Sequence, residues 1–132
     1  MNILDISAIQ AQTVEAGGYI VFDTTNLHRG LAINHVDGST NTRIVSKGIY
    51  NVFFNADVIP SGAGEITVTL ENNGVALNSA TFTGVATIGE NIAFAIAFPV
   101  MKSCPCISNV ANLKVSVSAD ATIINAHLLV KD

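Results

Sequence analysis

The sequence predicts an all-β fold with the two packed sheets of a sandwich or jelly roll. Three observations support this prediction. β-Branched and aromatic residues are concentrated in short runs, many runs alternate apolar with polar residues, and turn residues separate them at intervals of about 8 to 12 residues. A chain of 132 residues is typical of one domain.

The N-terminal segment is the only stretch with helical spacing, and that spacing is weak. Its apolar residues include Ile3, Leu4, Ile6 and Ile9. A short helix, an added strand and an arm are all compatible with this pattern. Gly17-Gly18 separates the segment from the rest of the chain, so we expect an N-terminal arm over residues 1–18 and a jelly-roll domain over residues 19–132.

Strands are expected one after another beyond Gly18. They are Tyr19–Asp23, Leu31–Val36, Thr42–Ser46, Gly48–Ile59, Glu65–Glu71, Val75–Thr83, Asn91–Pro99, Leu113–Ser118 and Thr122–Lys131. Asp37-Gly38-Ser39 and Asn72-Asn73-Gly74 predict tight hairpin turns, because Asn-Gly supplies the positive φ that such turns need. Residues 101–109 lack alternation and predict an exposed loop.

Two long strands carry most of the information about function. In the first, Tyr50, Val52, Phe54, Ala56 and Val58 share one face, while Asn51, Phe53, Asn55 and Asp57 share the other. In the last strand, Ile124, Ala126, Leu128 and Val130 oppose Asn125, His127 and Lys131. Phe53 places a large ring among polar neighbours, which indicates a subunit contact.

Composition favours an oligomer and excludes several functions. Hydrophobic residues make up 49% of the chain and charged residues 12%. Some of this apolar surface is expected in a subunit interface, and the alternative is a plain β-sandwich that buries it in its own core. The six cations are scattered, which argues against nucleic-acid binding. No apolar run reaches the roughly 20 residues of a membrane span. No signal-peptide pattern opens the sequence, so we expect synthesis in a cytoplasm without use of the secretory pathway.

No convincing catalytic or metal-binding set is visible, so we expect no enzyme, no cofactor and no metal site. The carboxylates are isolated and no Gly-x-Ser-x-Gly elbow occurs. Cys104-Pro105-Cys106 lacks zinc-site spacing and is compatible with free thiols, a later disulfide or metal binding. His28 and His35 are expected to be exposed. His127 is either a hydrogen-bonded interface histidine or a site for an ion or a pH response.

Several motifs resemble a known family. They are the GIY run at Gly48–Tyr50, YIVFDTTN at Tyr19–Asn26, the NNGVAL hairpin at Asn72–Leu77, the loop around Cys104–Cys106, and the TIINAHLLV run that ends at Val130. Over residues 19–131 the chain resembles the tumour-necrosis-factor-like jelly roll, including the globular heads of complement's collagen-tailed recognition subunit. It is most similar to the bacterial and bacteriophage members.

The resemblance implies a compact homotrimer with one sheet around a threefold axis. It places Asn51, Phe53, Asn55, Asn125 and His127 at the trimer interface. Phage members serve as head fibres, decoration proteins or fibre tips, so the resemblance implies a structural protein on the virion surface, made in the host cytoplasm.

Attachment to a capsid or another particle protein is then expected through the N-terminal arm, with Ile3, Leu4, Ile6 and Ile9 as its apolar contacts. Two other functions fit the same fold. One is a fibre tip that binds a receptor or a host-surface glycan, and the other is a bacterial spore-coat or cell-surface protein.

Overall fold

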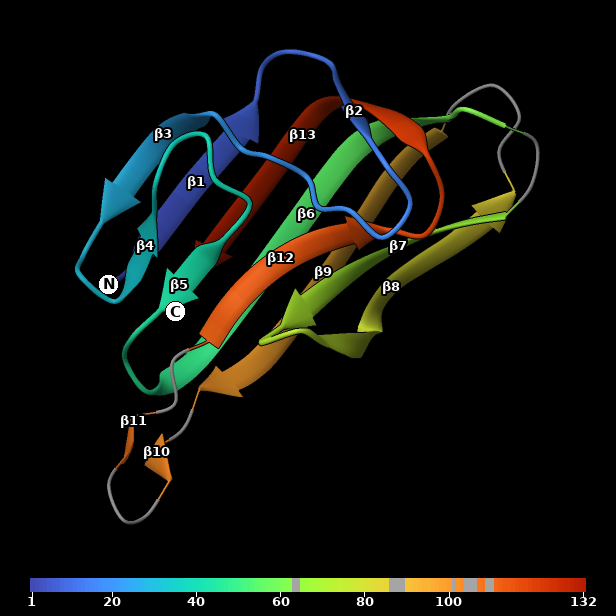
Figure 1. The fold of residues 1–132 in the computed structure, drawn as a ribbon. Helices are drawn as coiled ribbons and strands as arrows, with labels where there is room; N and C mark the ends of the chain where they lie inside the picture. Colours follow the sequence, from blue (N-terminus) through green and yellow to red (C-terminus); the bar gives the residue numbers. More distant parts are fainter. Residues whose placement is uncertain (63–64, 86–89, 101, 104–106, 109–110) are drawn as a thin grey trace.

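Two stacked antiparallel sheets make up the body of the protein in a computed structural model (Figure 1). The model describes residues 1–62, 65–85, 90–100, 102–103, 107–108 and 111–132. The larger sheet has the order β3-β1-β13-β6-β9, with β2 also paired to β13. Its strands are β1 (Ile3–Ala8), β2 (Gln12–Val14), β3 (Thr24–Arg29), β6 (Gly48–Pro60), β9 (Glu90–Val100) and β13 (Ala121–Lys131).

The second sheet has the order β4-β5-β12-β7-β8. Its strands are β4 (Ile33–His35), β5 (Thr42–Ile44), β7 (Glu65–Asn72), β8 (Val75–Val85) and β12 (Ala111–Val117). A short ribbon of β10 (Lys102–Ser103) and β11 (Ile107–Ser108) projects from one end of the sandwich (Figure 1). Most neighbouring strands are distant in sequence, and the chain passes repeatedly between the sheets, as in a jelly roll.

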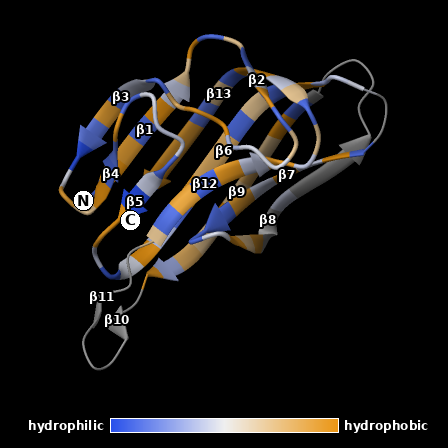
Figure 2. Ribbon diagram, viewed as in Figure 1, coloured by the Kyte–Doolittle hydropathy of each residue, from blue (hydrophilic) through white to orange (hydrophobic). Residues whose placement is uncertain are grey.

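The hydrophobic core fills the space between the two sheets. Along β6 the inward side chains Tyr50, Val52, Phe54, Ala56 and Val58 are all buried, as the alternation predicted. The matching inward positions of β7, β12 and β13 are buried too, and Figure 2 shows the resulting alternation of hydrophobic and hydrophilic bands along the strands.

Tyr50 is the largest of the fully buried side chains. Its hydroxyl donates a hydrogen bond to the backbone oxygen of Ser46 (2.9 Å), which satisfies the one polar atom of the ring. Burial raises the pKa of Tyr50, because the charged phenolate loses more solvation than the neutral phenol.

The prediction of a separate N-terminal arm is wrong. Residues 3–8 form β1, which lies between β13 and β3 in the larger sheet. Leu4 and Ile6 are fully buried and Ile3 is partly buried, whereas Ile9 is 67% exposed. The pattern ILDISA alternates with the period of a strand, and the weak helical spacing hid it. Residues 1–18 are therefore part of the domain rather than a unit before it.

The last strand contains a bulge that the sequence pattern did not predict. Ile124 was predicted to share a face with Ala126, but Ile123 and Ala126 are the buried residues. The register of β13 against β6 shifts between Ile124 and His127, and Asn125 has φ +53°. One extra residue reverses the phase of a strand, and asparagine tolerates positive φ better than most residues.

Most of the predicted strands are confirmed, with shifted ends. Tyr19–Asp23 is the exception, because Tyr19 and Phe22 make only isolated bridges and β3 begins at Thr24. Residues 17–20 instead bond to the edge of β12, for example from Ile20 N to Val115 O (2.9 Å). The predicted loop over residues 101–109 contains β10 and β11, and Cys104 and Cys106 lie outside the described residues.

Of the two histidines that were predicted to be exposed, one is and one is not. His28 lies exposed on β3 rather than in a turn. His35 is half-buried, with its ring nitrogens 2.9 Å from Phe22 O and 3.0 Å from Asn41 O. These contacts connect β4 to the 17–23 segment.

Within the part of the chain that the structure describes, no helix is long and apolar enough to cross a membrane.

Candidate functional site

The face of the larger sheet that points away from the core is the first candidate for a functional surface, and we call it the outer face. Its side chains come from alternate positions of adjacent strands, so they stand in rows across the sheet. The register gives the rows Asp5–Leu129–Phe53–Ala95, Ser7–His127–Asn55–Ala93 and Ile3–Lys131–Asn51–Ala97. Paired residues of adjacent strands lie within contact distance on the same face.

Apolar side chains dominate the part of the outer face over β6 and β9. Ile49 is 67% exposed and Phe53 and Ile59 are each 40% exposed. Beside them, Ala93, Ala95, Ala97 and Pro99 are exposed along β9. Three large apolar side chains on β6, separated by polar ones, thus stand next to a strip of small side chains on β9. Exposed apolar side chains gathered on adjacent strands indicate an interaction site.

Polar and charged groups occupy the β1 and β13 side of the outer face. His127 Nε2 lies 2.5 Å from Asp5 Oδ1, and both side chains are partly exposed. Asn26 Nδ2 donates to the same Asp5 oxygen (3.2 Å). Lys131 places its ammonium group 5.7 Å from the centre of the Phe53 ring. His127 is therefore hydrogen-bonded within the subunit, while its place at an interface and a pH response stay predictions.

Four of the five predicted interface residues lie together on the outer face. They are Asn51, Phe53, Asn55 and His127, whereas Asn125 is exposed in the bulge of β13, outside the paired rows. Their place at a trimer axis stays a prediction.

Sequence reasoning missed three groups on this face, namely Asp5, Leu129 and the β9 alanines. Asp5 was hidden by the interpretation of β1 as an arm. The alanines were detectable, since Ala93, Ala95 and Ala97 alternate with larger residues along residues 92–98.

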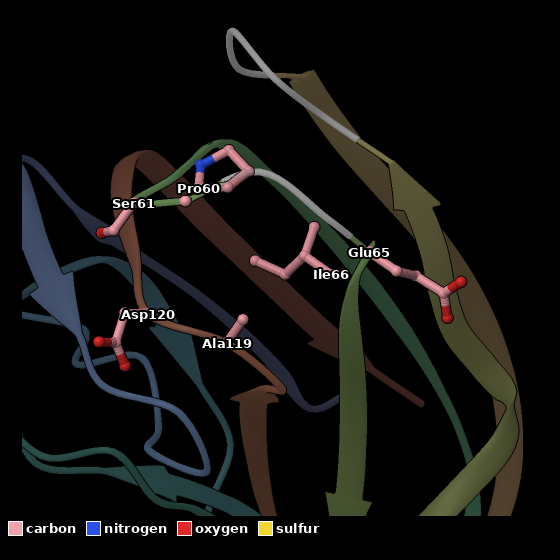
Figure 3. A pocket seen from close by; sticks show the side chains of 7 residues that line it. Pro60, Ser61, Glu65, Ile66, Ala119 and Asp120 are labelled. Atoms are coloured by element: carbon pink, nitrogen blue, oxygen red, sulfur yellow. The ribbon is translucent and has the colours of Figure 1, made fainter.

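A cleft of about 340 Å³ lies at one end of the sandwich, between the β6–β7 connection and the β12–β13 turn (Figure 3). It is lined by Pro60, Ser61, Gly62, Glu65, Ile66, Ala119 and Asp120. The two carboxylates point in opposite directions (Figure 3), and Asp120 Oδ1 already accepts a hydrogen bond from Ala16 N (2.8 Å). Diverging carboxylates do not make an acid–base pair.

Metal-ligating side chains do not cluster in the described ranges. Among those residues no group of three histidine, cysteine, aspartate or glutamate side chains is placed to hold a metal ion. The Asp5–His127 pair has two such groups, and its third neighbour is the amide of Asn26.

Comparison with known proteins finds similarity in structure alone. No protein-family model and no curated protein sequence matches the chain. The crystal structure of murine APRIL at pH 8.5 superposes with a TM-score of 0.65 at 14% identity, over 99% of this chain and 98% of that one.

The globular domain of zebrafish complement 1qA gives a TM-score of 0.65 at 9% identity, over 99% and 96% of the two chains. PRD1 vertex protein P5 gives 0.55 at 11% identity, over 98% and 94%. These matches cover 98–99% of this chain, so they extend over both sheets. The protein therefore has the tumour-necrosis-factor-like jelly-roll fold that the sequence predicted.

Proposed function

We propose that this protein is a homotrimeric, non-enzymatic head on the surface of a virus particle, either a head fibre or a capsid decoration subunit. The observation that carries the proposal is the apolar outer face of the larger sheet. Phe53, Ile49 and Ile59 remain exposed there, although the inward side chains of the same strand are buried between the sheets.

A second copy of the same chain is the occupant that best fits this face. The β6 side of this face carries large side chains and the β9 side carries small ones, so a ring of one copy can lie over the alanines of another. A contact between two different parts of the same surface is heterologous, and three such contacts close a ring. The family resemblance adds that a trimer is the expected closure.

A place on a particle is supported by the fold of PRD1 vertex protein P5, whose structure covers nearly the whole chain. Two of the four residues that were expected to attach the protein, Leu4 and Ile6, are core residues and are not available for contact with a particle. The proposal therefore makes attachment a property of the assembled head and assigns it to no segment.

Two measurements test the proposal. Light scattering of the purified protein at micromolar concentration should give about three times the 13.8 kDa chain mass. The protein should also co-sediment with intact capsids and remain on them through a density gradient. A monomer in the first experiment overturns the trimer, and a trimer that never associates with capsids overturns the virion assignment in favour of a spore or cell-surface head.

The second candidate function is a glycan-binding head. A separate observation favours it, because a polar cleft with amide, phenol and ammonium groups lies on the second sheet. In a trimer formed through the larger sheet, this second sheet faces outward. Binding of a host-surface glycan by the isolated protein, without any capsid, is the measurement that separates it from a purely structural role.

A further inference from the structure

A cleft of about 440 Å³ lies on the outward side of the second sheet, where four segments meet. It is lined by Tyr19, Asn41, Asn73, Gly74, Asn112 and Lys114. Asn112 and Lys114 are alternate residues of β12, so both project to the same side of the sheet. The β7–β8 turn forms one side, and the 17–23 segment and the residue before β5 form the other. None of the lining side chains is aliphatic.

A network of asparagines fixes the shape of this cleft. Asn41 Nδ2 donates to Asn112 Oδ1 (3.3 Å), and Asn112 Nδ2 donates to Asn73 Oδ1 (2.8 Å). The backbone N–H of Asn73 donates to Asn112 O (3.0 Å), and Asn73 and Gly74 both have positive φ. Two hydrogen bonds therefore hold the turn against β12, and the amides are oriented before any ligand arrives.

One hydrogen-bond acceptor of this network has no donor among the described residues. The Asn41 Oδ1 atom is buried and accepts no hydrogen bond from the residues that the structure describes. Buried polar atoms nearly always have a partner, and an acceptor without one destabilises the folded state. Because this atom is enclosed by protein, it marks an incomplete point of the asparagine network and is not itself a ligand contact.

The other end of the cleft carries a cation with no carboxylate partner in the described part of the chain. The Lys114 ammonium lies 4.9 Å from the centre of the Tyr19 ring. His127–Asp5 is the one ion pair within 4 Å among the described residues, so Lys114 keeps its three N–H donors. Its cross-strand neighbour Glu71 instead accepts a hydrogen bond from the Tyr19 hydroxyl (3.2 Å), and that bond raises the pKa of Tyr19.

The charge around the cleft favours an anion on the Lys114 side. Arg43 is exposed on β5 and stands opposite Asn112 in the register, so it projects from the same side of the sheet. Glu71 stands opposite Lys114 in the register and accepts a hydrogen bond from the Tyr19 hydroxyl, so this side of the sheet carries two cations and one carboxylate around the cleft. Amides both donate and accept hydrogen bonds, as sugar hydroxyls do, so the lining of the cleft matches a hydroxylated ligand better than a purely apolar one.

We propose that this cleft binds a saccharide that carries a carboxylate, with the carboxylate at Lys114 and the ring hydroxyls at the asparagine amides. The assignment rests on the glycan-binding form of the proposed function and names its site and ligand class. Uronic acids of polysaccharides and terminal sialic acids share this chemistry. A glucuronate-containing disaccharide and sialyllactose distinguish these two sources, and lactose is the neutral control.

The test is a titration of the ¹⁵N-labelled full chain, followed by backbone amide shifts in NMR spectra. An acidic sugar should shift the amides of residues 19, 41, 73, 112 and 114, and lactose should bind at least tenfold more weakly. Lys114→Gln should weaken acidic-sugar binding about tenfold or more, because a charge-assisted hydrogen bond is lost. Lys47→Gln removes the same charge from an exposed position between β5 and β6 and should leave binding unchanged.

A second variant keeps the test meaningful if Lys114→Gln folds poorly. Asn112→Asp has nearly the same shape, removes the donor to Asn73 and adds a negative charge, so it should abolish acidic-sugar binding while thermal unfolding confirms the fold. Equal binding of lactose, shifts at other residues, or no shifts at millimolar sugar would each overturn the assignment. Light scattering on the same sample tests the trimer separately from the sugar site. A trimer that binds no sugar refutes the sugar site and leaves the trimeric head standing.

Discussion

Replacing Phe53 by aspartate should dissociate the trimer without unfolding the subunit. Phe53 stands on the outer face between Leu129 and Ala95, and its ring already has partial cover from Lys131. The side chain does not contribute to the core between the sheets, which is formed by its neighbours Val52 and Phe54. The substitution therefore acts on surface that association would bury, and adds a charge to it.

The size of the effect depends on the exposed part of the ring. Phe53 is 40% exposed. An aromatic side chain buries about 150–250 Å², so about 60–100 Å² remains for a partner to cover. At about 25 cal/mol per Å², that area contributes about 1.5–2.5 kcal/mol per copy, or about 4.5–7.5 kcal/mol per trimer. The trimer dissociation constant should rise by about 10³- to 10⁵-fold, before the cost of burying a carboxylate is added.

The assay is light scattering over a dilution series, with circular dichroism and thermal unfolding to confirm that the subunit is folded. Val36→Asp is the matched control. Val36 is 75% exposed and comes directly after β4 in the second sheet, so the same change in chemistry falls outside the outer face. Val36→Asp should leave the mass unchanged.

Two results would refute the reasoning. A Phe53→Asp protein that remains a trimer at all concentrations would show that the outer face is not the interface. A Val36→Asp protein that dissociates equally would show that any added charge has this effect, and would remove the special status of Phe53.

Three further predictions concern the fold. Leu4→Ala should lower the free energy of unfolding by about 2–5 kcal/mol, because it opens a cavity in the core, whereas Ile9→Ala should change it by less than about 0.5 kcal/mol in denaturant titrations. Asn125→Ala should cost about 1–2 kcal/mol and Asn125→Gly much less, since glycine adopts positive φ without strain; retention of full stability by the alanine variant would contradict this. Tyr50 and Tyr19 should ionise above the ordinary pKa of about 10, because both pKa values are raised. The contribution of the two neutral phenols to the free energy of unfolding is complete below pH 10 and is lost as the pH rises through the folded-state pKa. Tyrosinate absorbance and denaturant unfolding above pH 10 would measure this loss.

The sequence predicted the fold class and the two faces of β6 because strand alternation is a local property. Inward and outward residues of β6 could be assigned from period 2 alone, and the burial of Val52 against the exposure of Phe53 agrees. Alternation does not report which strands become neighbours, so the rows that bring Asp5, Leu129 and Phe53 together required the structure. Pairing of the first and last strands is a long-range contact that leaves no local pattern.

Two local signals were present in the sequence but were interpreted wrongly. The alternation of ILDISA was masked by apolar residues that also fit a weak helical period, and Gly17-Gly18 suggested a boundary that is in fact a turn against β12. Asn125 carried the other signal, because an asparagine within an apolar strand is a favourable place for positive φ. Its identity allowed a bulge but did not require one, so the phase of β13 could not be settled without coordinates.

The outward faces of the two sheets differ in chemistry, and this difference bears on both proposals. After Asn91, the outward positions of β9 are three alanines and a proline, whereas those of β12 are Asn112, Lys114 and Ser116. If solubility alone had shaped the surface, both faces would be polar, since nothing in strand geometry requires alanine at exposed positions. An apolar face is best explained by burial in a partner, and a polar face with oriented amides is best explained by continued contact with water and soluble ligands. The two proposals are therefore compatible in one molecule, because association through one sheet leaves the cleft on the other sheet open.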